Sequence, residues 1–191
     1  MFAIDPGAFL MRIITRASVP ERDALALLGI QNTKQNRTEK PMPQSLAKIL
    51  LHLIYSTKNR EPVLRDDIRD ELHRYSAGIL KELESPAILI NSVEDHIHIL
   101  YSHSKNYSPS KIVEEVKKGS SKWLKTKGAA YSGFHWQNGY GAFSVSQSGV
   151  AEVVRYIESQ KEHHRRKTFQ EEYRELLRRY EVPYDERYVW D

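Results

Sequence analysis

From Ser45 onward, apolar and polar positions alternate with the periods that strands and helices require. Apolar side chains at every second position predict a first strand that ends near Tyr55, and the opposite side of this strand carries His52. Apolar residues at steps of three and four then predict a helix over residues 64–83. The chain therefore begins its patterned part with a strand followed by a helix.

The pattern continues with three more strands and a second helix. Residues 87–93 and 95–103 predict two strands whose short connection favours a hairpin. Ser108 followed by Pro109 is typical of a helix start, and residues 139–146 predict a fourth strand. The order β-α-β-β-α-β predicts a ferredoxin-like α+β fold, with a four-stranded antiparallel sheet and two helices on one face. The other face is then available for a functional site or for another element.

Additional helices are expected after the sheet. Ser148 is the expected N-cap of a helix that runs through Gln160. Thr168 and Glu171 have the spacing of a capping box at the start of a last helix. The predicted fold class is therefore α+β with additional C-terminal helices.

The N-terminal residues lack this strong pattern. Residues 19–30 predict at most one short helix, and the polar residues 31–43 predict a linker. We therefore divide the chain into an N-terminal extension, 1–41, which is expected to be poorly ordered or to form one short helix, and a single domain, 42–191. A translation start assigned too early, with Met42 as the true first residue, would explain the extension.

Composition excludes several classes of protein. The chain has 191 residues, 40% of them hydrophobic, and no cysteine, which excludes disulfide scaffolds, cysteine-ligated metals and thiol nucleophiles. No stretch reaches the roughly 20 apolar residues of a membrane helix, and the acidic Asp5 is unlike the start of a signal peptide. We expect a cytoplasmic protein without a membrane partner.

Charge is distributed unevenly, although the net charge is only +4. Seven lysines and two glutamates lie between His103 and Gly128, and a second basic stretch spans residues 155–167. Basic patches bind nucleic acid by neutralising phosphates, whereas a single basic stretch is also typical of a solvated helix face. Two such stretches on either side of a candidate site favour nucleic acid.

The clearest candidate for chemistry is the pair His96 and His98. Alternation along a strand places both imidazoles on the same side, on the sheet face that the two helices leave open. They could hold one metal ion with a third ligand, although a structural or exposed role remains the alternative. A third ligand is expected from the helix after the fourth strand, where Tyr156 and Gln160 are four residues apart and share one face, although each taken alone is typical of an ordinary helix surface.

These motifs resemble a known family. His96-Ile97-His98 is similar to the HUH signature of the single-tyrosine transposases, which move insertion sequences as single-stranded DNA. Residues 156–160 resemble their catalytic helix, in which a tyrosine precedes a glutamine by four. The resemblance covers residues 42–191 and includes the branch associated with repetitive extragenic palindromes, through the segments 42–46, 56–62, 136–146, 162–165 and 185–190.

The resemblance implies a DNA transposase that cleaves and rejoins single-stranded DNA at hairpin-bearing element ends. Tyr156 would be the nucleophile and would form a 5′-phosphotyrosine link, while His96, His98 and Gln160 would bind a divalent ion, Mg²⁺ or Mn²⁺. It also implies a nucleoid-associated protein of a prokaryote, and it leaves a homodimer or a monomer open. The residues expected to contact DNA are Lys117, Lys118, Lys122, Lys125, Arg155 and Arg165.

Three other functions remain open at this point. A ferredoxin-like module that binds single-stranded nucleic acid would show salt-sensitive binding and no covalent adduct. A metal-dependent hydrolase using the histidine pair would release a 5′-phosphate and would not need Tyr156. A relaxase or replication-initiation nuclease shares the histidine pair but usually places its tyrosine differently and belongs to a larger chain.

Overall fold

The computed structural model of the protein describes residues 45–165 and 167–190. The expected short helix over residues 19–30 and the expected linker over residues 31–43 lie outside these residues, as does the whole extension 1–41. In chain order the described elements are β1 (Ile49–Ser56), the 3₁₀ turn η1 (Lys58–Arg60), α1 (Asp66–Glu82), β2 (Ala87–Ser92), β3 (His96–His103), α2 (Pro109–Lys125), η2 (Ala129–Tyr131), β4 (Gly141–Ser144), η3 (Gln147–Gly149), α3 (Val150–Glu158), α4 (Gln160–His163) and α5 (Phe169–Arg179).

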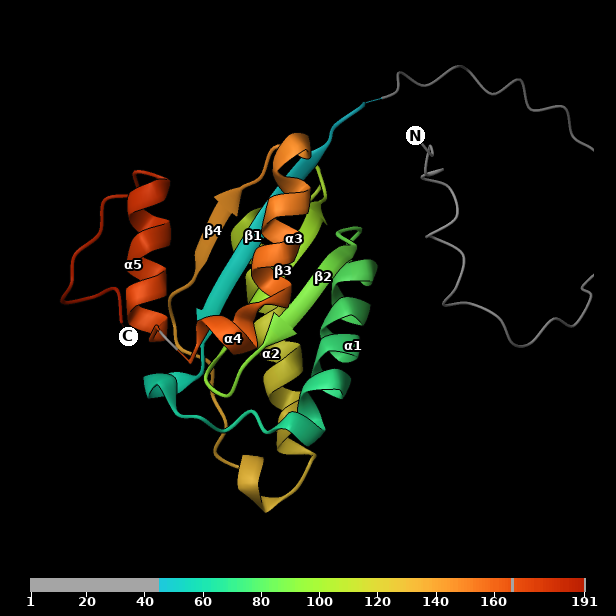
Figure 1. Cartoon of the computed structure of the whole chain (residues 1–191). Helices are drawn as coiled ribbons and strands as arrows, with labels where there is room; N and C mark the ends of the chain where they lie inside the picture. The colour runs from blue at the N-terminus through green and yellow to red at the C-terminus, as the bar shows by residue number, and fades with distance from the viewer. Residues whose placement is uncertain (1–44, 166, 191) are drawn as a thin grey trace, which may run out of the picture. The chain divides into compact units, whose positions relative to one another are not determined.

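The four strands form one sheet in the order β2-β3-β1-β4, and every neighbouring pair is antiparallel (Figure 1). β1 and β3 occupy the centre, and their register pairs Ile54 with His98 and Leu53 with Ile99. The predicted α+β class and the antiparallel four-stranded sheet are confirmed. β3 lies between two strands, so its backbone is paired on both edges and its side chains project from a fixed position toward the two faces of the sheet.

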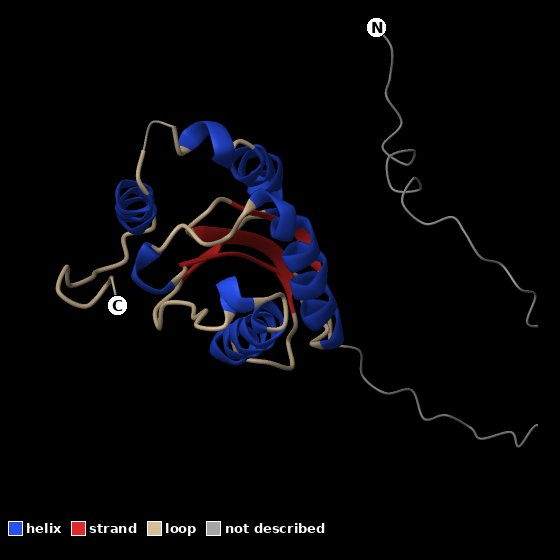
Figure 2. Cartoon of the chain, turned by 90° about the horizontal axis from the view of Figure 1, so that it is seen from below, coloured by secondary structure: helices blue, strands red, loops and turns tan. Residues whose placement is uncertain are grey.

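One face of the sheet is covered by α1 and α2 and contains an apolar core. Leu53 and Ile99 from the strands pack with Leu72 of α1 and with Ile112 and Val116 of α2. These side chains are fully buried, so this face carries most of the apolar burial that stabilises the fold. Figure 2 shows the sheet between helices on both sides.

The opposite face is covered by the C-terminal helices. α3 packs on β2 and β3, and Ile54 and Phe143 pack with Phe169 and Tyr173 of α5 in a second, smaller core. Gly141 permits this approach, since a Cβ atom at this position would lie 2.6 Å from Cε2 of Tyr173. The face that the sequence left open to a site or another element is therefore occupied by helices.

Two local expectations were wrong. The residue that caps the turn after β4 is Ser146, not Ser148, because its side chain accepts from the amide of Gly149 and starts η3. The helix expected to run through Gln160 ends at Glu158, where the Ser159 hydroxyl donates to the carbonyl of Tyr156 at 3.0 Å. α3 and α4 are consequently separate elements.

The fourth strand is shorter than expected, with bounds Gly141–Ser144 instead of 139–146. Residues 137–139 direct their carbonyl groups to the ammonium of Lys117, at 2.6 to 3.1 Å. The Gln137 amide still donates to the Ser56 carbonyl at 3.0 Å, but the regular ladder with β1 begins only at Gly141. The capping box of Thr168 and Glu171 and the Ser108 cap form as predicted. None of the helices in the described part of the chain has the length and apolar character that crossing a bilayer requires.

Candidate active site

β3 places the imidazoles of His96 and His98 on the face covered by the C-terminal helices. Both side chains are completely buried, and their ring centroids lie 5.0 Å apart. Ile97 and Ile99 point into the apolar core on the opposite face. The structure therefore brings the two histidines together as the alternation along the strand predicted.

Each imidazole is held through its Nδ1 atom. Asp95 Oδ1 lies 2.6 Å from Nδ1 of His96, and His52 Nε2 lies 3.0 Å from Nδ1 of His98. The Nε2 atoms of both histidines are buried and make no hydrogen bond. Because a metal-binding imidazole uses one nitrogen for the ion and the other for an orienting partner, this arrangement is the one a metal site needs.

Tyr156 and Gln160 reach the same place from α3 and the start of α4. The end of α3 is tied to β2, since the Asn91 amide donates to the carbonyl of Ile157 at 2.7 Å. Gln160 is completely buried, and its Oε1 atom also lacks a hydrogen-bond partner. Tyr156 lies beside His98, with ring centroids 5.8 Å apart. The break at Ser159 does not separate the two side chains.

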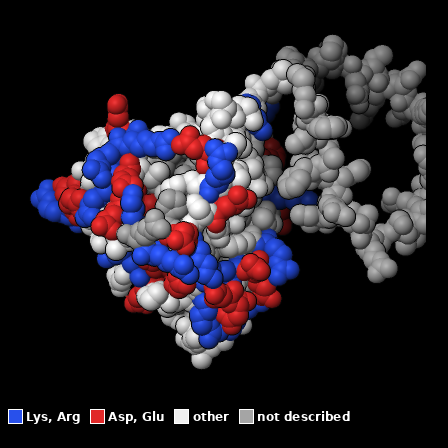
Figure 3. Space-filling model, viewed as in Figure 1, with Lys and Arg blue, Asp and Glu red and all other residues white. Residues whose placement is uncertain are grey.

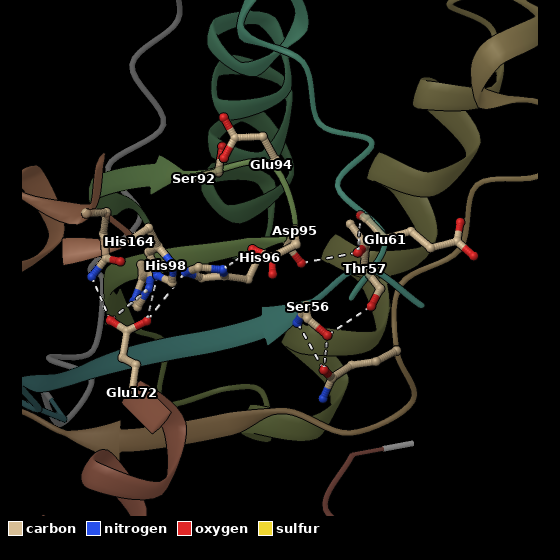
Figure 4. A network of polar contacts seen from close by, with 12 residues as sticks. Ser56, Thr57, Glu61, Ser92, Glu94, Asp95, His96, His98, His164 and Glu172 are labelled. Carbon is tan, nitrogen blue, oxygen red and sulfur yellow. Dashed lines mark hydrogen bonds and ion pairs between the residues drawn. The ribbon is translucent and has the colours of Figure 1, made fainter. Parts of the chain in front are cut away.

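Glu172 of α5 contacts all of these groups, although no motif in the sequence marked it. Figure 4 shows its carboxylate directed toward His96, His98 and His164. One carboxylate oxygen, Oε1, accepts hydrogen bonds from the Tyr156 hydroxyl and, at 2.8 Å, from the Gln160 amide. The other, Oε2, lies 3.1 Å from Nε2 of His164. The two oxygens also lie 3.5 and 3.6 Å from the open Nε2 atoms of His96 and His98, respectively.

A signal for Glu172 existed in the sequence. It lies three residues after Phe169 and four before Leu176, so it shares the apolar stripe of α5. An acid on a buried stripe requires compensation by other polar groups. His52 was similarly undervalued, since its role comes from pairing across strands to His98 and not from any spacing along the chain.

Burial and neighbouring charges shift the pKa values of this group strongly. Burial, followed by the nearby Glu172 carboxylate, raises the pKa of Tyr156 well above that of a free phenol. Burial lowers the pKa of His98 and so favours the neutral ring. Burial alone would raise the pKa of Glu172, but the surrounding imidazoles, above all His98, outweigh it and hold that pKa far below its usual range. The group is therefore a carboxylate among imidazoles, with a protonated phenol.

The donor atoms at this site fit a divalent metal ion. Two imidazole nitrogens and one amide oxygen are buried without hydrogen bonds and belong to side chains that meet at one carboxylate. His96, His164 and Glu172 also place ligand atoms within 4.8 Å of one another. Imidazole together with oxygen donors suits transition ions such as Mn²⁺ better than it suits Mg²⁺, which prefers oxygen alone.

The residues expected to bind DNA lie in two separate places. The four lysines are on α2, whose apolar side packs in the core on the other side of the sheet from Tyr156. Lys118 and Lys122 are exposed and Lys125 is half-buried. Lys117 is engaged within the fold, where its ammonium also lies 4.7 Å from the centre of the Tyr55 ring.

The two arginines lie on the same side as the tyrosine. Arg155 precedes Tyr156 on α3 and Arg165 follows α4, and both are exposed. Figure 3 shows basic and acidic side chains interspersed over the face that carries these helices. The described residues of this face therefore present individual cations and not one broad basic surface.

A pocket of about 300 Å³ opens beside Tyr156. Its wall includes His52, Tyr180, Arg155 and Arg179, and the Arg179 guanidinium is paired with Glu152 at 2.7 Å. Aromatic side chains elsewhere in the domain are mostly enclosed by protein. Trp136 and Phe143 are buried in the two cores, Trp123 is half-buried and stacks on Tyr75, and Tyr140 is half-buried.

We compared the chain with known protein families and structures. The family described as "Transposase IS200 like" matches residues 45–160, from the first strand through Gln160. The chain belongs to this family of HUH single-tyrosine transposases. Membership shows a protein of DNA transposition and mobile elements, and it implies DNA-cleaving activity.

Individual proteins are also similar to this chain. The ISDra2 transposase TnpA of Deinococcus radiodurans is 27% identical over 114 residues, which are 57% of this chain and 81% of the relative. A crystal structure of a presumed transposase from Deinococcus radiodurans R1 is 25% identical, with a TM-score of 0.50 over 63% of this chain and 97% of that one. A tyrosine transposase associated with repetitive extragenic palindromes, solved with such a hairpin bound, is 13% identical, with a TM-score of 0.48 over 65% of this chain and 74% of that one.

Proposed function

We propose that this transposase cleaves and rejoins single-stranded DNA through a covalent link to Tyr156, with a divalent metal ion held by His96, His98 and Gln160. The observation that supports this most directly is the convergence of four side chains on Glu172. The Tyr156 hydroxyl and the Gln160 amide share one of its oxygens, and the open imidazole nitrogens lie 3.5 and 3.6 Å from its two oxygens.

This chain's residues would perform the reaction in defined roles. The Tyr156 oxygen would attack the scissile phosphorus, and the bond between phosphorus and the 3′ oxygen would break. The leaving 3′ oxygen would take up a proton from water and become a 3′-hydroxyl. A phenol is mostly protonated at neutral pH, and the carboxylate of Glu172 already accepts its hydrogen, so the proton has an acceptor. His96, His98 and Gln160 would hold a divalent ion beside this phosphate, and such an ion would supply Lewis-acid stabilisation of the developing charge.

Rejoining follows from the same link. A phosphotyrosine is a diester, so a 3′-hydroxyl from another strand can attack it, release Tyr156 and reform a phosphodiester without a nucleoside triphosphate. The pocket beside Tyr156 has a volume of about 300 Å³ and includes Arg155 and Arg179, whose guanidinium groups suit phosphate. In this proposal the scissile nucleotide occupies the pocket beside Tyr156. The remaining DNA, with its hairpin, extends along the exposed basic side chains near this pocket, such as Arg155 and Arg165.

The order of strands and helices supports a ferredoxin-like description of the domain, since β1-α1-β2-β3-α2-β4 builds a sheet in the order β2-β3-β1-β4. All four proposed site residues belong to one chain and meet without a partner subunit. This favours a site completed by the subunit's own Tyr156, in a monomer or within each copy of a dimer.

The decisive experiment is detection of the adduct. The protein is incubated with Mn²⁺ and a 5′- or 3′-labelled single-stranded oligonucleotide that carries the hairpin of its element end. We expect a protein–DNA species that survives denaturation and whose DNA is joined through its 5′ end. Tyr156→Phe should abolish this species, whereas Tyr75→Phe, on the opposite side of the sheet, should retain it.

The same assay separates the alternatives. Salt-sensitive binding without any adduct would favour a binding module. Release of a 5′-phosphate that persists in Tyr156→Phe would favour a hydrolase in which the histidine pair acts alone. Cleavage with adduct formation but no joining to a second strand would favour a nuclease of the relaxase type.

A further inference from the structure

We propose that Glu172 is itself a ligand of the divalent ion, so that α5 completes the metal centre. This inference rests on the proposed function, because it concerns the ion at the same site. It adds a carboxylate, from a helix outside the span that the family model matches, to the three ligands expected from the sequence.

The distances at Glu172 suit atoms that share an ion. Oε2 lies 3.5 Å from Nε2 of His96, and Oε1 lies 3.6 Å from Nε2 of His98. These separations are too long for good hydrogen bonds, which span about 2.7–3.2 Å. Ligand atoms that each lie about 2.1 Å from a tetrahedral ion are about 3.4 Å apart. The carboxylate is therefore already close to the spacing that a common cation would set.

Glu172 also determines which end of the Gln160 amide can bind a metal. Its Oε1 accepts from Nε2 of Gln160 at 2.8 Å, which leaves the buried Oε1 of Gln160 without a hydrogen bond. An amide binds a cation through oxygen and never through its NH₂ group. The same carboxylate thus orients a second ligand.

The charge around Glu172 points the same way. Its side chain is 6% exposed, and among the described residues its ion pairs are all with imidazoles, namely those of His96, His98 and His164. A buried carboxylate is costly unless a positive charge compensates it. A divalent ion between Glu172 and the two open imidazole nitrogens would supply that charge.

The test measures metal binding without DNA. The full-length, metal-free protein is titrated with Mn²⁺, and free Mn²⁺ is followed by electron paramagnetic resonance. We expect Glu172→Gln to weaken Mn²⁺ binding by at least about tenfold and Glu172→Asp to restore part of it. Glu175→Gln changes an exposed acid one turn away that pairs with Lys167, and it should bind Mn²⁺ as the wild type does.

A second readout distinguishes a ligand from a positioning residue. The visible absorption of bound Co²⁺ reports the donor set, so Glu172→Gln should change its band positions and intensities. Unchanged bands, with or without weaker binding, would overturn the assignment of Glu172 as a ligand. Mn²⁺ affinity within about twofold of wild type would overturn it as well.

A loss of metal binding is distinguished from a folding defect by comparing each variant with and without Mn²⁺. The rise of the thermal midpoint on adding Mn²⁺ reports binding to the folded state, and it should be smaller for Glu172→Gln than for Glu175→Gln. The adduct assay tests the proposed function separately. Metal binding that requires Glu172, without any Tyr156 adduct, would overturn that function and uphold this inference. An adduct with metal binding independent of Glu172 would do the reverse.

Discussion

On β3, alternate side chains enter two very different interiors. Ile97 and Ile99 join an apolar core with α1 and α2, whereas His96 and His98 enter a polar one under α3, α4 and α5. Both pairs are completely buried. Apolar burial stabilises a fold without further conditions, but buried polar groups stabilise it only when they have partners. Polar groups on the second face hydrogen-bond to one another, yet three atoms that could bind a metal, two imidazole nitrogens and one amide oxygen, are buried without a hydrogen bond. Such a departure from full pairing is typical of functional sites.

The largest expected difference between the two faces of β3 comes from shortening one buried side chain on each face. Ile99→Ala should lower the free energy of unfolding by about 2–5 kcal/mol, because it leaves a cavity beside Leu53 and Ile90. Its folded fraction should bind Mn²⁺ with normal affinity. Urea unfolding and Mn²⁺ titration measure the two effects.

His98→Ala is the matched variant, and it should show the opposite result. Mn²⁺ affinity and adduct formation should fall by at least about 100-fold, since a direct ligand matters more than the outer partners, whose loss costs about 10–100-fold. Its circular dichroism should remain that of a folded protein. If Ile99→Ala abolished metal binding while folded, or His98→Ala unfolded the chain, the division of roles between the faces would be wrong.

A smaller effect tests a histidine on the core side. Burial lowers the pKa of His73 from 6.5 to about 4, with Asp70 opposing and Arg69 assisting, and its Nε2 lies 2.7 Å from the Ser92 hydroxyl. The folded state therefore binds fewer protons than the unfolded state between these values. Stability should be complete well above pH 6.5 and fall by roughly 3 kcal/mol as the pH drops to 4, since each unit of pKa shift corresponds to about 1.4 kcal/mol.

The comparison of wild type with His73→Gln isolates this contribution from other acid-sensitive groups. Glutamine keeps a polar atom near Ser92 but does not titrate. Urea unfolding at several pH values should show a shallower loss of stability for the variant. Parallel curves for the two proteins would contradict the assignment.

The smallest expected effect is on metal affinity and concerns His52, whose imidazole contacts that of His98. His52 is buried, and its pKa is lowered to about 3 by burial, then by His98, so it is neutral and can accept from Nδ1 of His98. His52→Phe removes the acceptor and should weaken Mn²⁺ binding by about tenfold. His52→Gln, which offers an oxygen or nitrogen near the same position, should recover much of it, and equal affinities for both variants would contradict an orienting role.

The sequence predicted the features that depend on local spacing. The two histidines on one face of a strand follow from alternation, and the Thr168 capping box follows from residue types three apart. The α+β class followed from the order of strand and helix periods. The end of α3 at Ser159 could not be predicted in this way, because a serine hydroxyl that donates to a preceding carbonyl can end a helix or merely bend it.

Glu172 and His52 depend on distances that the sequence does not contain. Glu172 reaches the site only because α5 crosses the sheet beside β4, and His52 matters only through the register of β1 with β3. Their residue types were visible, but the partners of Glu172 lie 8 to 76 positions away, from His164 to His96, and His98 lies 46 positions from His52. Such long-range pairings require the assembled sheet.

Gly141 has a consequence that reaches beyond packing. It carries no chemistry, yet the Tyr173 ring rests where its side chain would be, and Tyr173 is the residue next to Glu172. Adding a single methyl group there would bring it against the Tyr173 ring, so the ring would have to shift, and we expect the adjacent Glu172 carboxylate to be disturbed as well. A search restricted to polar positions would overlook this glycine, although the space that it leaves for the Tyr173 ring helps α5 to pack beside Glu172.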